Sequence, residues 1–247
     1  MMITLQVVLA ILPCLLIMYL IYRMDLYERE DLFPLALCFL LGMLIVFPLY
    51  EIQQFFYDRG WSNTNTIPWA LFSSLVVVAL SEESFKYLAL RIYPYRQSFF
   101  NEPIDGVVYA MMVGMGFAAL ENIFYAFQFE MTTTLIRGIT AVPAHASFAV
   151  IMGYWLGKAR FAKNGRLRYL FLAWAVPVGV HGLYNFFVLQ EVYDWLIVFS
   201  VIILSVALFI AVRLVKQQQA ESPFKVEEDA PPPESIEPIW PGDDLGA

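Results

Sequence analysis

The sequence predicts an all-α, polytopic membrane protein: a transmembrane helical bundle of about seven spans with a disordered acidic C-terminal tail. Hydrophobic residues make up 60% of the 247 residues, and the mean hydropathy is +0.63. Apolar runs long enough to cross a bilayer recur from one end of the chain to the other. A soluble domain with one core does not have this composition. We expect a transmembrane domain over residues 1–218 and the tail over residues 219–247.

The apolar runs define the spans in order, and charged or polar residues separate them. The first run has no basic residue before it and no small-residue cleavage site after it, so we expect a retained helix. A polar stretch at 51–68 reads as a loop, and so does a short polar turn at 131–134. The expected spans are 3–22, 32–50, 69–93, 104–129, 135–157, 169–190 and 195–215.

The distribution of Lys and Arg predicts the orientation of these spans. The linker 158–168 contains five basic residues and no acid. If this linker is cytoplasmic, the positive-inside rule places twelve of the fifteen basic residues on that side and two on the other. We therefore expect the N-terminus outside and the C-terminus in the cytoplasm.

The net charge of −7 comes from the tail, where eight acids accompany one lysine. The tail also contains three consecutive prolines at 231–233 and cannot bury a core, which indicates disorder. No basic, aromatic-rich surface of the kind that binds nucleic acid is present, so nucleic acid is excluded as a partner. Cys14 and Cys38 lie in apolar runs and read as packing residues.

Three charged residues, Glu82, Glu83 and Lys86, interrupt the apolar third span. A charge at the centre of a spanning helix costs ~2.5 to 3.5 kcal/mol on insertion scales, so these residues are expected to face a polar interior. The i,i+3 and i,i+4 spacings allow either glutamate to pair with the lysine. Lys86 is expected to keep one glutamate ionised while the other takes up a proton, and Glu83 is our choice for the base.

Four more polar residues fall inside later spans: Glu121, His145, His181 and Asn185. His181 and Asn185 share a helix face because they are four residues apart. Small residues flank Glu121 and both histidines, and these residues allow helices to approach closely. We expect the side chains to converge in one site. Arg137 is expected to extend to the membrane interface.

The charges in this site permit two kinds of hydrolytic chemistry. In the metal-free version, a glutamate activates water, and His145 or His181 with Asn185 stabilises the oxyanion. In the metal version, both histidines and Glu121 or Glu83 hold Zn²⁺, and a remaining glutamate is the base. The sequence contains no His-Glu-x-x-His helix, and the histidines come from different spans. This favours the metal-free version, with Zn²⁺ as the alternative.

Two functions other than hydrolysis use the same residues. An ion-coupled transporter can use intramembrane Glu and His as a proton relay. A noncatalytic scaffold can use them to set helix packing. No internal repeat of the kind common in transporters is evident in the sequence.

The sequence resembles the PrsW family of intramembrane proteases over about residues 69–190. Glu82-Glu83-x-x-Lys86 is similar to the family's Glu-Glu-x-x-Lys motif, Phe117-x-x-x-Glu121 to its second motif, and His145 and His181 to its later histidines. His181-x-x-x-Asn185 also resembles the last motif of the type II CAAX prenyl endopeptidases. Those enzymes carry Glu-Glu-x-x-x-Arg and Phe-x-x-x-His instead, which favours PrsW over a prenyl-protein endopeptidase.

The resemblance implies a protease of the bacterial cytoplasmic (inner) membrane. Its substrate would be a membrane-anchored, single-span protein in the lipid bilayer, by analogy an anti-sigma factor cut at the first site of a stress-response cascade.

Overall fold

A computed structural model describes residues 2–225 of the chain. Every regular element in this part is a helix. Seven helical segments are long and apolar enough to cross a membrane. The structure therefore confirms the predicted all-α bundle of seven spans.

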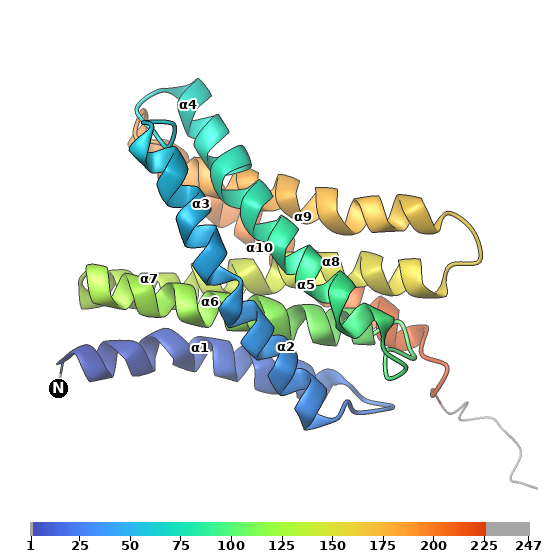
Figure 1. Cartoon of the computed structure of the whole chain (residues 1–247). Helices are drawn as coiled ribbons and strands as arrows, with labels where there is room; N and C mark the ends of the chain where they lie inside the picture. Colours follow the sequence, from blue (N-terminus) through green and yellow to red (C-terminus); the bar gives the residue numbers. More distant parts are fainter. Residues whose placement is uncertain (1, 226–247) are drawn as a thin grey trace, which may run out of the picture.

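Several of the spans consist of two or more shorter helices (Figure 1). The first span is the single helix α1 (Met2–Met24), and the second consists of α2 (Leu32–Leu44) and α3 (Val46–Asp58). The third consists of α4 (Ile67–Phe72), the π-helix η1 (Ser73–Leu80), α5 (Ser81–Ile92) and the 3₁₀ turn η2 (Pro94–Arg96). The other four are formed by α6 (Asp105–Gln128), α7 (Met131–Ile139) with α8 (Ala141–Phe161), α9 (Arg166–Leu189), and the 3₁₀ turn η3 (Asp194–Leu196) with α10 (Ile197–Ala220).

The structure corrects the two loops predicted at 51–68 and 131–134. Residues 51–58 continue the second span as the end of α3, so only 59–66 form a loop there. Residues 131–134 are the first turn of α7. The polar residues of α3 are compatible with a helix because the Gln53 amide donates a hydrogen bond to Glu82 inside the bundle.

The helix α6 forms the centre of the bundle. It packs against α1 and α2 on one side and α8 on the other (Figure 1). Of the residues in its most apolar stretch, 83% are buried. Glycines allow the backbones of these helices to come into direct contact. A Cβ atom on Gly153 would lie 2.2 Å from the Gly106 carbonyl oxygen, and one on Gly116 would lie 2.0 Å from the Phe39 carbonyl oxygen. No side chain larger than hydrogen fits at these two positions unless the helices separate.

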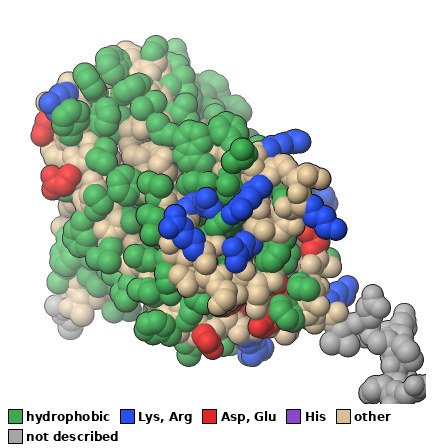
Figure 2. Space-filling view, turned by 45° about the vertical axis from the view of Figure 1, so that its right-hand side comes forward, with side chains coloured by type: hydrophobic (Ala, Val, Ile, Leu, Met, Phe, Trp, Pro, Cys, Tyr) green, Lys and Arg blue, Asp and Glu red, His purple; other side chains and the backbone are tan. Residues whose placement is uncertain are grey.

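The loops 25–31, 97–104 and 162–165 lie together at one end of the bundle, which we call the basic end (Figure 1). Figure 2 shows Lys and Arg side chains gathered on the face turned toward the viewer at this end. The loop 59–66 and the connection between α6 and α7 lie at the opposite end. Which end faces the cytoplasm stays a prediction of the charge distribution.

The predicted tail begins inside a helix. Gln219 and Ala220 are the last residues of α10, and residues 221–225 continue in a turn. The rest of the predicted tail, 226–247, lies outside the described residues.

The close contact between α6 and α8 predicts a difference between two glycine substitutions. Gly153→Ala should destabilise the protein by about 1–3 kcal/mol, because the methyl group collides with backbone atoms. Gly179→Ala, in α9, should be neutral or slightly stabilising, because nothing lies within 4 Å of its Cβ position. Thermal unfolding of the two variants in detergent measures the difference, and equal melting temperatures would contradict the packing described here.

Candidate active site

The residues Glu82, Glu83 and Lys86 lie on the first turns of α5, directly after the π-helix η1. Their side chains are buried although they are ionisable, with exposed fractions of 3%, 0% and 3%. π-helical turns occur frequently at functional sites. The chain therefore changes helical geometry where it introduces charge into the membrane.

Lys86 compensates the two glutamates. Its Nζ atom lies 2.7 Å from Glu83 Oε1 and 3.5 Å from Glu82 Oε2, as the predicted i,i+3 and i,i+4 pairing requires. The same Nζ atom lies 3.2 Å from His145 Nδ1 and 4.1 Å from the centre of the Phe117 ring. Lys86 thus connects α5 to α6 and α8.

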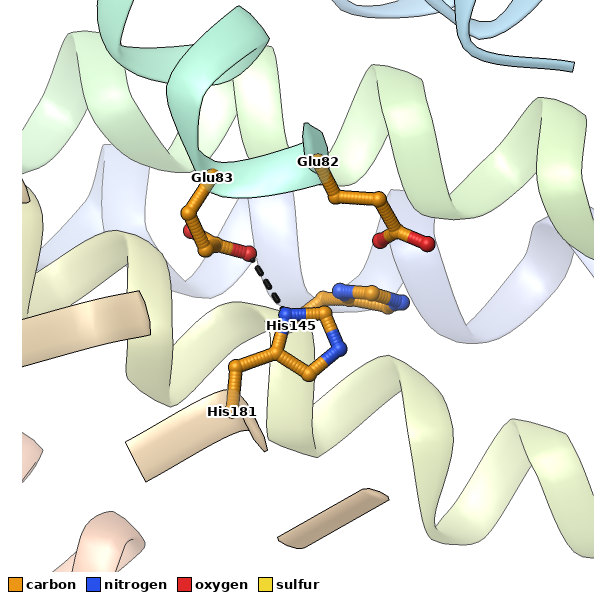
Figure 3. A group of neighbouring side chains, drawn as sticks. All are labelled: Glu82, Glu83, His145 and His181. Atoms are coloured by element: carbon orange, nitrogen blue, oxygen red, sulfur yellow. Dashed lines mark hydrogen bonds and ion pairs between the residues drawn. The ribbon is translucent and has the colours of Figure 1, made fainter. Parts of the chain in front are cut away.

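The two histidines approach the glutamates from α8 and α9 (Figure 3). His181 Nδ1 lies 2.9 Å from Glu83 Oε1, and its Nε2 atom lies 3.0 Å from the Asn185 amide nitrogen. The His181 ring stacks on Phe148 with 4.8 Å between ring centres. Both histidines therefore direct Nδ1 toward Lys86 or Glu83.

Glu121 forms the outer part of the site together with Arg137. Glu121 Oε2 accepts a hydrogen bond of 2.6 Å from Arg137 Nη2 and lies 3.1 Å from His145 Nε2. Arg137 Nε also donates to Asn122 Oδ1 at 2.8 Å. Arg137 was expected at the membrane interface, but its guanidinium instead pairs with a site carboxylate.

All seven predicted site residues belong to this connected group of side chains. Four of them, Glu82, Glu83, His145 and His181, can each offer one ligand atom so that all four atoms lie within 4.8 Å of one another. Glu121, which the sequence offered as a metal ligand, lies outside this set and contacts His145 through Nε2.

The four donors fit a divalent metal ion. Imidazole nitrogen and carboxylate oxygen are ordinary ligands of Zn²⁺. Glu82 Oε2 and Glu83 Oε2 are buried and accept no hydrogen bond in the structure. A buried carboxylate oxygen without a donor is costly, and a cation in contact with it removes this cost.

Two adjoining cavities lead to the site. The larger, of about 640 Å³, lies among α3, η1 and α6, and the smaller, of about 200 Å³, reaches both histidines and Asn185. They share lining residues, among them Gln53, Glu82 and Glu121. Glu83 lines neither of these two cavities. The neighbouring glutamates therefore differ, because Glu82 faces open space and Glu83 faces Lys86 and His181.

The sequence interpretation did not identify Gln53 or Arg137 as site residues. Gln53 lies in the stretch predicted to be a loop, but its amide lies 3.2 Å from Glu82 Oε1. An arginine near the end of a span can equally extend to the interface. One feature of the sequence pointed to Arg137 as a site residue: three glutamates lie inside the spans, and Lys86 alone does not balance their charge.

Comparison with known proteins identifies the family. A family model described as "PrsW family intramembrane metalloprotease" matches residues 31–213. The Protease PrsW of Geobacillus kaustophilus is 36% identical over 170 residues, which cover 69% of this chain and 73% of that protein. The Protease PrsW of Clostridioides difficile is 33% identical and covers 78% and 83%, and that of Bacillus subtilis is 36% identical and covers 71% and 78%. No solved structure matches the chain significantly. The chain, with its buried Glu-Glu-x-x-Lys turn and its two converging histidines, belongs to the PrsW family of intramembrane proteases.

Proposed function

We propose that this protein is a metal-dependent endopeptidase of the bacterial inner membrane that cuts a membrane-anchored protein. One observation carries the proposal, namely the four donor atoms of Glu82, Glu83, His145 and His181 within 4.8 Å of one another beside a cavity. The sequence alone favoured metal-free chemistry because the histidines lie on different spans. Their convergence, together with the two carboxylate oxygens that lack a donor, supports the metal version.

Glu83, His145 and His181 would hold the metal ion. Zn²⁺ bound there would act as a Lewis acid that polarises the scissile carbonyl and lowers the pKa of a water molecule. Ligation through His181 Nδ1 requires a proton on Nε2. Asn185 Oδ1 accepts a hydrogen bond from this N–H if the oxygen and nitrogen of the Asn185 amide exchange places.

Glu82 is then the general base. It faces both cavities, where water and the substrate arrive, whereas Glu83 is fixed by Lys86 and His181. The Gln53 amide donates to Glu82 Oε1 and orients this carboxylate. This assignment reverses the choice of Glu83 as the base that the sequence favoured.

Arg137 and Glu121 have a positioning role. A carboxylate that accepts a hydrogen bond from the second nitrogen of a metal-binding histidine fixes the tautomer and the orientation of the ring. Glu121 is placed to do this for His145 Nε2, and Arg137 holds Glu121 ionised against the apolar surroundings. Arg137 also neutralises the charge of Glu121, one of the three glutamates of the site.

The larger cavity supports a polypeptide substrate. Its volume of about 640 Å³ lies within the range of ordinary ligand pockets. Amide side chains of Gln53, Gln54 and Gln128 line it and offer donors and acceptors to an extended backbone. Ser62 and Thr64, in the loop at the end opposite the basic end, also line the cavity. We propose a single-span anti-sigma factor as the substrate, on the resemblance to the PrsW family.

The different roles proposed for Glu82 and Glu83 are testable by changing each residue to glutamine. Glu82→Gln should keep about one zinc ion per chain and lower cleavage by about 100-fold or more, because it removes the base and not a ligand. Glu83→Gln and His181→Ala should lose both zinc and cleavage. Elemental analysis of detergent-purified protein, paired with a cleavage assay, measures both quantities.

The exposed Glu51 of α3 provides the control, because Glu51→Gln should change neither zinc content nor cleavage. Full cleavage activity of the Glu82→Gln variant would exclude Glu82 as the general base. Full zinc content in the Glu83→Gln variant would remove Glu83 as a ligand.

Replacement of Arg137 tests the positioning role. Arg137→Met should weaken zinc binding or cleavage by about 10–100-fold, the usual effect of losing an outer partner of a metal ligand. Arg213→Met, which removes an exposed arginine of α10 that contacts Phe209, should have no effect. Competition with a chelator measures the zinc affinity. An Arg137→Met protein with unchanged affinity and activity would contradict the role proposed for Arg137.

The substrate class is testable in proteoliposomes. A membrane-anchored anti-sigma factor should be cleaved by the wild-type protein and left intact by Glu82→Gln. The same factor without its membrane span should be cleaved much more slowly, because it does not enter the bilayer beside the site. Proton-coupled uptake of a solute without cleavage of any membrane-anchored protein would favour a transporter instead.

A further inference from the structure

A second group of buried carboxylates lies at the basic end, away from the active site. Asp25, Glu28 and Glu30 come from the loop between α1 and α2, while Glu102 and Asp105 come from the segment that begins α6. Asp105 and Glu121 are sixteen residues apart on α6, which corresponds to about 24 Å along the helix. We call these five residues the acidic cluster.

Four residues of the acidic cluster are buried, and Glu28 is half-buried. Asp25 is 1% exposed, and Glu102 and Asp105 are both 0% exposed. Asp105 Oδ2 accepts hydrogen bonds from the backbone amides of Asn101 and Glu102, at 2.7 and 2.8 Å. Glu30 accepts a hydrogen bond from the Tyr109 hydroxyl. These bonds fix the backbone around the cluster and leave most of the oxygens without a donor.

Seven buried oxygen atoms in and beside the cluster have no hydrogen-bond partner. Both carboxylate oxygens of Asp25 and both of Glu102 are among them, although the Glu30 amide and the Ser222 hydroxyl lie nearby. The other three are Glu28 Oε2, Asn101 Oδ1 and Asp105 Oδ1. Two whole carboxylates are thus buried without a hydrogen bond of normal geometry in the described part of the chain.

No Lys or Arg side chain forms an ion pair with the cluster within the described residues. Burial, followed by the neighbouring Glu102 carboxylate, raises the pKa of Asp25 to about 7. Burial also raises the pKa of Glu30 and the pKa of Glu102. Burial therefore disfavours the ionised form of these carboxylates, and either a bound proton or a bound cation offsets this cost.

We propose that the acidic cluster binds a hydrated divalent cation of the Mg²⁺ type. The donors are all oxygen atoms, which hard cations prefer over the nitrogen-containing set of the active site. No three of these acidic residues bring their oxygens as close together as the four donors of the active site. A cation that keeps several of its water molecules and binds through one or two carboxylates spans this wider spacing.

The cation would join three segments that are distant in sequence. The α1–α2 loop contributes Asp25, the segment before α6 contributes Glu102, and Ser222 after α10 lies beside Glu102. The Gln219 amide of α10 already donates to the Met24 carbonyl oxygen in the same region. The site is therefore structural, and it stabilises the basic end without contact with the reacting groups.

The test uses the full-length protein in detergent after treatment with a chelator, with Mn²⁺ as a paramagnetic substitute for Mg²⁺. His181→Ala removes one active-site donor, so that binding by the acidic cluster is observed separately. This variant should bind about one Mn²⁺ ion, and Mg²⁺ should compete for it. Adding Asp25→Asn and Glu102→Gln to the same variant should abolish the binding.

Thermal unfolding provides an independent measurement. Mg²⁺ at a hundred times its dissociation constant should raise the folded-to-unfolded ratio of the wild-type protein about 100-fold, and should leave Asp25→Asn/Glu102→Gln unchanged. In chelator this double variant should be at least as stable as the wild type, because the amides remove repulsion, and this result shows that it folds.

Two results would overturn the proposal. One is the absence of Mn²⁺ binding by the His181→Ala protein at millimolar concentration, and the other is binding that persists after both cluster substitutions. Both results are measurements of Mn²⁺ binding and not of cleavage, so they do not test the proposed protease function.

Discussion

The compensation of buried charge is the constraint on which the structure depends. Two glutamates on one turn of α5 and a third on α6 lie in an apolar bundle, where an unpaired carboxylate costs several kcal/mol. Lys86 supplies the first positive charge from the same turn, and Arg137 supplies the second from α7. His145 connects these two pairs, since it contacts both Lys86 and Glu121. The helices α5 to α9 are therefore arranged around one polar network.

This network requires helices that approach closely and do not move apart. Gly114 of α6 packs against Ala149 and the His145 backbone of α8, close to where Glu121 contacts His145. Phe117 and Phe148 cover the other sides of Lys86 and His181. Aromatic rings exclude water there and strengthen every electrostatic interaction of the site. Of the two adjacent glutamates, Glu82 lines both cavities and Glu83 lines neither, which makes them chemically different.

The sequence predicted the spans because long apolar runs mark helices that cross lipid. It predicted that the polar residues inside the spans converge because a charge there is costly unless it faces a polar interior. The loop predicted at 51–58 was wrong because Gln53 and Gln54 of α3 line a cavity inside the bundle. Arg137 and the different surroundings of Glu82 and Glu83 depend on contacts between helices, which spacing along one helix does not encode. The acidic cluster was missed for the same reason, since Asp25 and Glu102 read separately as ordinary loop acids.

The central claim is that Glu83, His145 and His181 bind the metal ion while Glu82 acts as the base. X-ray absorption at the zinc edge of the zinc-loaded Glu82→Gln protein tests it most directly, because this variant keeps every proposed ligand. The account predicts two imidazole nitrogens and a carboxylate oxygen around zinc at about 2.0–2.2 Å. A zinc ion without imidazole ligands, or a fully active wild-type protein without bound metal, would contradict it.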